Sequence, residues 1–223
     1  MSAQELEIVH PLPRDNAITV VATGERIAVD EAGQPVSVIA REEIDRIQGA
    51  DITRVLERAP GVTISRNGGV GGFTAVRVRG ADAEQLLVLV DGVRVADAAS
   101  PGGGFDFGNL LAGSIDKLEL LRGSNSVVWG SQAIGGVLVI RTRALDGVEG
   151  SAELGAHDSR YATLSAGGSA GSVSGGLTAS FHDSEGISSA GVGAEPDGYR
   201  QYQVTGRVRA EVSSSFALIA NAR

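Results

Sequence analysis

Residues 115–143, IDKLELLRGSNSVVWGSQAIGGVLVIRTR, decide the fold of this chain. Two stretches within them, 117–121 and 137–142, are rich in leucine and β-branched residues, which is typical of buried strands. An Arg-Gly turn and a loop of small residues around Trp129 separate the two stretches. Glycine tolerates backbone conformations in which a side chain would collide, so the glycines of this loop indicate tight turns. The segment predicts two core strands joined by a compact connection.

The residues before this segment predict a small α+β domain. Apolar spacing predicts short helices over 42–48 and 52–59, the second capped by Asp51 and ended by Pro60-Gly61. Asp91-Gly92 is a favoured two-residue hairpin turn between two apolar runs. Alternating or apolar runs predict short strands over 35–40, 62–64, 75–79, 86–90 and 93–95.

The residues after 146 have a different pattern, with extended segments of about ten residues joined by polar or glycine turns. In the fourth of them, Tyr202, Val204 and Val208 alternate with Gln203 and Thr205. Such alternation is typical of membrane strands that have one face toward lipid and the other toward a wet lumen. A soluble meander with one wet face is the alternative. The predicted strands cover 148–156, 160–170, 173–183, 200–212 and a fifth stretch from 216 onward.

Composition excludes several classes of protein. The formal charge of −8 over 223 residues argues against a nucleic-acid partner, which needs a basic surface. Cysteine is absent, and the three histidines are too far apart in sequence to suggest a metal site. No apolar run reaches 18 residues, so no transmembrane helix is predicted. The start lacks the pattern of a signal peptide, and the end lacks a closing turn, so we expect a trimmed N-terminus and a fragment of a longer protein.

Four motifs occur together and in order: DITRVLERAPGVTI from Asp51, VRVRG from Val76, LLVLVDGVRV from Leu86, and KLELLRGSNSVVWGSQAIGGVLVIRT from Lys117. In this order they resemble the plug domain of TonB-dependent outer-membrane receptors. The resemblance implies an α+β plug domain followed by the first strands of an antiparallel transmembrane β-barrel, which has 22 strands in the family. It also implies a flexible periplasmic tail over 1–32, a plug over 33–145, and four to five truncated barrel strands over 146–223.

The family keeps near its N-terminus a TonB box, an extended segment that pairs with the TonB energy-coupling protein by β-augmentation. A short β-prone island occupies the corresponding place in this chain. The resemblance assigns it Ala17, Ile18, Thr19, Val20, Val21 and Ala22.

Two glycine-rich loops resemble the ligand loops of the cobalamin transporters within this family, SRNGGVGGFTAVRVRG from Ser65 and DGVRVADAASPGGGFDF from Asp91. Glycines expose backbone groups that can bond a polar ligand, although turn formation alone also explains them. Cobalamin is therefore the first expected nutrient, and a ferric siderophore or haem is the alternative. The implied substrate-binding residues are Asn67, Gly68, Gly69, Val70, Gly71, Phe73, Asp97, Pro101 and Gly102.

The resemblance assigns two further sets of residues. Arg79 and Arg122 each precede a glycine after a strand, where the family's arginines contact the barrel wall; an ordinary surface arginine in a turn is the alternative. An acidic loop offers Asp183, Glu195 and Asp197 as ligands for the calcium that some members bind. Calcium takes six to eight oxygens, so this set is incomplete and solvation of an exposed loop also explains it. No other cofactor is expected.

The expected function is active import of a large nutrient across the bacterial outer membrane, with the plug and the tail facing the periplasm. The expected partners are the coupling protein, outer-membrane lipid and a small-molecule nutrient. A soluble periplasmic binding module is the rival, but it has no need of the alternating segments. An enzyme is not predicted, because NGGVGG lacks nucleotide-loop spacing and no acids are paired for catalysis.

Overall fold

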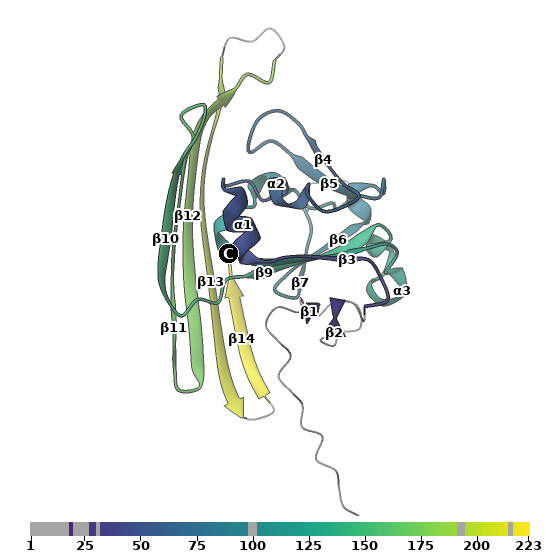
Figure 1. Cartoon of the computed structure of the whole chain (residues 1–223), viewed down its shortest axis with the longest axis vertical. Helices are drawn as coiled ribbons and strands as arrows, with labels where there is room; N and C mark the ends of the chain where they lie inside the picture. The colour runs from purple at the N-terminus through teal and green to yellow at the C-terminus, as the bar shows by residue number, and fades with distance from the viewer. Residues whose placement is uncertain (1–17, 20–26, 30–31, 98–101, 191–194, 214–215) are drawn as a thin grey trace, which may run out of the picture.

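A computed structural model describes residues 18–19, 27–29, 32–97, 102–190, 195–213 and 216–223. Figure 1 shows two parts, an α+β domain and a long sheet of strands beside it. The α+β domain contains three helices, α1 (Arg41–Ile47), α2 (Thr53–Leu56) and α3 (Ser126–Trp129). Its strands are β3 (Val36–Ile39), β4 (Val62–Arg66), β5 (Thr74–Val78), β6 (Leu86–Val90), β7 (Val93–Val95), β8 (Ile115–Arg122) and β9 (Gly136–Thr142).

The central sheet of the α+β domain has the order β3-β8-β9-β6-β7, in which only β6 and β9 pair in parallel. Its middle strands bury both faces. In β9, Leu138 and Ile140 pack toward α1 and α2, whereas Val137 and Val139 pack toward Trp129 on the other face. Burial on both faces explains why these strands are continuous apolar runs in the sequence. Strands β4 and β5 form a separate hairpin.

Four single-turn 3-10 helices connect these elements. They are η2 (Ala83–Gln85), η3 (Phe107–Asn109), η4 (Ala112–Ser114) and η5 (Ser131–Ala133). None of the helices in the described residues is long and apolar enough to span a membrane.

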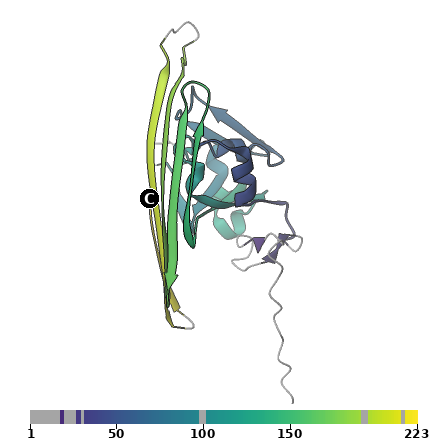
Figure 2. The same ribbon diagram turned by 60° about the vertical axis from the view of Figure 1, so that its left-hand side comes forward.

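The strand sheet consists of five antiparallel strands in chain order. They are β10 (Gly147–Leu154), β11 (Arg160–Ala170), β12 (Val173–Ile187), β13 (Asp197–Ser213) and β14 (Phe216–Ala222). Figures 1 and 2 agree that this sheet is a tall wall with the α+β domain on one side. Within the described residues the sheet does not close on itself.

The two faces of the strand sheet differ as the alternation predicts. Thr178, Gln203 and Thr205 are buried against the α+β domain, whereas Tyr202 and Val204 are exposed on the opposite face. An apolar outer face and a polar covered face are the reverse of a soluble protein and the arrangement of a membrane strand. The prediction of barrel-type strands is therefore confirmed as a fold.

Several element limits differ from the predictions. Strand β12 continues to Ile187 and β13 begins at Asp197, so this hairpin is longer than predicted. Asp51 is not the N-cap of α2, which is Ile52, although an Asp51 carboxylate oxygen accepts a hydrogen bond from the Thr53 N–H at 2.9 Å. Helix α3 was not predicted, because four residues are too few to show a helical period.

Candidate functional site: the loop pair and the face toward the strand sheet

Two loops of the α+β domain carry most of the predicted substrate-binding residues. The first loop, residues 67–73, joins β4 to β5, and the second loop, residues 102–106, leads into η3. Asp106, at the end of the second loop, accepts hydrogen bonds at 2.9 Å from the backbone N–H groups of Thr74 and Gly108. One carboxylate therefore ties the bases of both loops together. Asp106 was not among the predicted site residues, because its Asp-Phe-Gly context gives only a weak turn signal.

The first loop lies against the ends of β12 and β13. A Cβ atom on Gly68 would lie 2.8 Å from the Ser189 Oγ, and one on Gly71 would lie 2.1 Å from the Tyr199 ring. Gly71 also has φ +87°, which disfavours any residue with a side chain. These two glycines are required by close approach to the strand sheet. Val70 and Phe73 of the same loop remain 38% and 40% exposed, so they present apolar surface beside the glycine backbone.

The second loop lies elsewhere on the α+β domain. A Cβ atom on Gly102 would overlap the Glu84 carboxylate, and the Asp97 N–H donates to the Gly104 carbonyl at 3.2 Å. Pro101 lies outside the described residues. The structure therefore divides the predicted substrate-binding residues into two groups, which are connected through Asp106.

Gly71→Ala is expected to lower the midpoint of thermal unfolding by several degrees, which corresponds to about 2 kcal/mol. The new methyl group would displace the Tyr199 ring and break its hydrogen bond to Asn109 Oδ1, now 3.0 Å. Circular dichroism melting of the variant checks this. Gly69→Ala is the matched control, because its nearest neighbour would lie at an ordinary 3.8 Å. Equal melting temperatures for the two variants would contradict the close contact.

The α+β domain contacts the strand sheet mainly through a docking segment, residues 107–114, which includes η3 and η4. Gln203 of β13 accepts from the Leu111 N–H at 3.1 Å and donates to Ser114 Oγ at 2.7 Å. The Asn109 carbonyl accepts from Gln201 Nε2 at 2.7 Å. Because a buried side-chain amide satisfies both its donor and its acceptor here, the contact is specific in register.

Gly113 is the point of closest approach within the docking segment. Its Cβ would lie 2.5 Å from Tyr161 Oη, 2.6 Å from Thr163 Oγ1 and 2.7 Å from Ser180 Oγ. These hydroxyl groups belong to the polar face of β11 and β12. The absence of a side chain at Gly113 lets the η4 backbone lie directly on that face.

Charged groups cross the same interface. Arg143 Nη2 lies 2.7 Å from a carboxylate oxygen of Glu149, and Arg207 Nη1 lies 3.3 Å from a carboxylate oxygen of Asp91. Gly49 N donates to the Glu153 carboxylate at 2.6 Å. The α+β domain and the strand sheet thus each contribute both positive and negative side chains to the contact between them.

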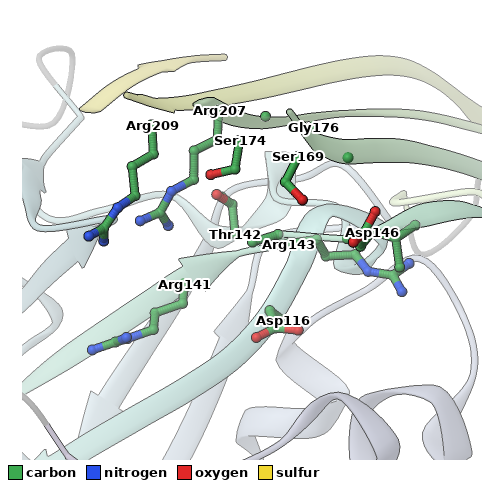
Figure 3. Close-up of a pocket in the computed structure, with 14 residues that line it drawn as sticks. Asp116, Arg141, Thr142, Arg143, Asp146, Ser169, Ser174, Gly176, Arg207 and Arg209 are labelled. Atoms are coloured by element: carbon green, nitrogen blue, oxygen red, sulfur yellow. The ribbon is translucent and has the colours of Figure 1, made fainter. Parts of the chain in front are cut away.

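A cavity of about 400 Å³ lies between the α+β domain and the strand sheet. Figure 3 shows that arginines line it from both sides, Arg141 from β9 and Arg143 from just after it, and Arg207 and Arg209 from β13. Asp116 also lines the cavity. Burial raises the pKa of Asp116 above its ordinary value, although the nearby Arg143 and Arg41 guanidinium groups act in the opposite direction.

Arg79 and Arg122 lie beside each other, within the α+β domain. The Arg79 N–H donates to the Gly61 carbonyl at 2.7 Å, and Arg122 Nη1 donates to the Pro60 carbonyl at 3.1 Å. Gly123 lies beneath the Arg79 side chain, with its Cβ position 3.6 Å from Arg79 Nη1. Their hydrogen bonds to described residues stay within the α+β domain, so contact with a barrel wall remains a prediction for this pair.

Part of the predicted TonB box is described. Ile18–Thr19 forms β1, which pairs antiparallel with β2 (Ile27–Ala28). A segment that pairs as a strand here has the backbone form that β-augmentation needs. Ala17, Val20, Val21 and Ala22 lie outside the described residues.

The predicted calcium ligands do not converge in the described residues. Arg200 Nε donates to the Asp183 carboxylate at 2.7 Å, and the Ser189 N–H donates to the Asp197 carboxylate at 2.7 Å. Glu195 is exposed. Within the described part of the chain, no group of three acidic, histidine or cysteine side chains is placed to hold a metal ion. Calcium binding here remains a prediction.

Comparisons with known proteins agree with this architecture. Residues 28–137 match the family described as the TonB-dependent Receptor Plug Domain. The pyoverdine outer membrane receptor FpvA from Pseudomonas aeruginosa, bound to pyoverdine, is similar with a TM-score of 0.75 and 17% identity, over 92% of this chain and 29% of that one. The siderophore receptor PirA from Acinetobacter baumannii is similar with a TM-score of 0.65 and 24% identity, over 83% of this chain and 30% of that one.

This chain spans about 30% of the length of those solved structures. At these identities the similarity establishes the fold, and both solved structures are described as receptors. The prediction of a plug followed by antiparallel strands is confirmed, whereas the comparisons do not single out the cobalamin subgroup. The α+β domain of this chain, which matches the plug-domain model over residues 28–137, and the strands that follow it have the fold of TonB-dependent receptors.

Proposed function

We propose that this chain is part of an outer-membrane receptor that imports a large nutrient with energy from the TonB coupling protein. One observation carries the proposal: the α+β domain covers the polar face of the strand sheet, while Tyr202, Val204 and Val208 are exposed on the apolar face. An apolar face suits lipid, and a polar face suits a lumen that the α+β domain fills. The plug and the N-terminal tail face the periplasm in this proposal.

The nutrient that fits best is a ferric siderophore. Two solved relatives are described as receptors of siderophores or of pyoverdine, which supports this class. Cobalamin is the second candidate, because the sequences of both glycine-rich loops resemble those of cobalamin transporters. The first loop offers glycine backbone beside the exposed Val70 and Phe73 side chains, which suits a ligand with both polar and apolar parts.

Binding titrations of the complete receptor test the nutrient. Ferripyoverdine, ferric enterobactin and cobalamin are added separately to purified protein in detergent, and binding is followed by quenching of tryptophan fluorescence. We expect saturable binding of a ferric siderophore and none of cobalamin. Binding of cobalamin but of neither siderophore would overturn the siderophore assignment. If the complete protein is soluble without detergent and binds none of the three ligands, the receptor proposal is overturned.

Val20→Pro is expected to abolish energy-dependent uptake and leave ligand binding to whole cells unchanged. Proline lacks the N–H that a paired strand donates, so it disrupts augmentation at the TonB box. Uptake of radiolabelled ligand by cells that express the complete receptor measures this. Val20→Ala, which keeps the N–H, is the control and retains uptake. Undiminished uptake by the proline variant would show that residues 17–22 do not couple to TonB.

A further inference from the structure

Arg141 and Arg207 both face the gap between the α+β domain and the strand sheet. Both residues line the cavity of about 400 Å³ and also a second cavity of about 270 Å³. Figure 3 shows their guanidinium groups extending toward the same side, Arg141 from β9 and Arg207 from β13. The second cavity has an apolar lining that includes Leu89, Trp129 and Val139. Two cations from opposing surfaces therefore face one partly apolar space.

The carboxylates beside these arginines have other partners. Asp91 accepts from Thr142 N at 3.0 Å and from Thr142 Oγ1 at 2.5 Å, and Arg207 approaches it through one nitrogen at 3.3 Å. Glu119 is fully buried and lies 2.5 Å from Lys117 Nζ, but 3.8 Å from Arg141 Nε. Arg207 thus approaches Asp91 through Nη1, and Arg141 approaches Glu119 through Nε.

A guanidinium group has five N–H donors, so both arginines keep most of their hydrogen-bonding capacity. Arg141 and Arg207 are 32% and 28% exposed, so a ligand in the gap can reach both. Guanidinium groups bind carboxylate and phosphate oxygens in a bidentate manner, and these bonds are stronger than neutral ones. Asp116 and Asp146 line the first cavity but not the second. Asp91 lines the second cavity, but its carboxylate already accepts from Thr142 and Arg207, so one paired carboxylate stands there against two arginines. An anion is therefore favoured at the end nearer Trp129.

The gap lies far from the first loop. Ser174, near the start of β12, lines the first cavity, whereas the first loop lies against Ile187 at the end of that strand. Thirteen residue steps along a strand span about 40 Å, at roughly 3.3 Å per residue. A ligand that moves from the first loop along the face toward the strand sheet passes this region on its way to the other side of the α+β domain.

We propose that Arg141 and Arg207 form an oxyanion-binding site that takes a carboxylate or phosphate group in the gap between the α+β domain and the strand sheet. This role rests on the proposed function: the site receives the anionic group of the iron chelate as the chelate passes the α+β domain. The apolar lining of the second cavity accommodates the adjoining aryl or alkyl part of the same ligand.

Inorganic phosphate is the probe for the site itself. It is titrated into the complete purified receptor in a buffer free of other oxyanions, and binding is followed by calorimetry and by phosphorus NMR line width. Arg141→Gln is expected to weaken phosphate binding about tenfold or more, the loss of one bidentate contact. Arg160→Gln is the matched control, because it removes one positive charge at a strand end that lines neither cavity. Arg207→Gln is a second variant, although it also removes the contact to Asp91.

The outcomes separate the site from its role in transport. Absence of phosphate binding by the wild type, or equal affinity in Arg141→Gln and wild type, overturns the site. Loss of phosphate binding together with at least about fivefold slower siderophore uptake, at unchanged siderophore affinity, supports passage of the chelate through it. Loss of phosphate binding with unchanged uptake overturns the transit role and leaves a site for free oxyanions. If the receptor imports no chelate, the proposed function and the transit role fail together, while the phosphate titration still decides whether the site exists.

Discussion

Asp91→Ala is expected to lower the stability of the α+β domain by about 3 kcal/mol. The Asp91 side chain is only 4% exposed and joins the two parts of the molecule. One carboxylate accepts from both the backbone and the hydroxyl group of Thr142, and from Arg207 of the strand sheet. Alanine leaves the Thr142 N–H without its acceptor. It also leaves a β-carbon at φ +48°, where aspartate is better tolerated than alanine.

Hydrogen exchange at the Thr142 amide and chemical unfolding of the complete protein measure this effect. Asp91→Asn is the matched control, because asparagine tolerates the same backbone conformation and keeps an acceptor oxygen for Thr142. We expect Asp91→Asn to lose less than half as much stability as Asp91→Ala. An unchanged exchange rate at Thr142 in the alanine variant would show that the carboxylate does not hold this strand end.

Gly113→Ala is expected to weaken the packing of the docking segment against the strand sheet and to lower the free energy of unfolding by about 2 to 3 kcal/mol. The added methyl group would meet three hydroxyl oxygens within 2.5 to 2.7 Å, whereas ordinary contacts of a β-carbon are a full ångström longer. Two of those hydroxyl groups, on Thr163 and Ser180, are hydrogen-bonded to each other at 3.2 Å. Because of this hydrogen bond the two hydroxyl groups do not move apart independently. The docking segment therefore has to move away from the strand sheet.

Gly155→Ala is the control for this variant, because its Cβ would lie at an ordinary 3.5 Å from Ser159. Thermal unfolding and hydrogen exchange over residues 107–114 distinguish the two glycines. Faster exchange in that segment is expected only for Gly113→Ala. Equal melting temperatures and equal exchange rates in both variants would mean that the η4 backbone does not pack directly on the strand sheet.

Local sequence patterns predict those strands and helices in which buried and exposed side chains alternate at a regular spacing. The alternation of Tyr202, Gln203 and Val204 gave the correct faces of β13, because a strand exposes successive side chains on opposite sides. The turn at Asp91 was likewise predicted from its Asp-Gly pair. The length of the β12–β13 hairpin was underestimated, since its polar ends resemble a loop once the apolar alternation stops.

The contacts between the two parts of the molecule have no local signal. Gln203 and Leu111 are 92 positions apart, and nothing around either residue indicates the other. Gly113 looks like any turn glycine until Tyr161 and Ser180 are placed beside it. The oxyanion site likewise depends on bringing β9 and β13 together. Pairings of this kind follow from the tertiary structure, whereas the resemblance to a family predicts only that some contact exists.

The short connection between β9 and β10 limits how far the two parts can separate. Only residues 143–146 lie between Thr142 and Gly147, and fully extended they span about 14 Å. The Arg143 N–H is bonded to the Ser114 carbonyl at 2.9 Å, which shortens the free length further. This tether keeps the C-terminal end of the α+β domain beside the first strand in any open state. In the proposed receptor, an opening that leaves this corner folded would therefore form by unravelling from the N-terminal side or by a swing of the domain about the corner.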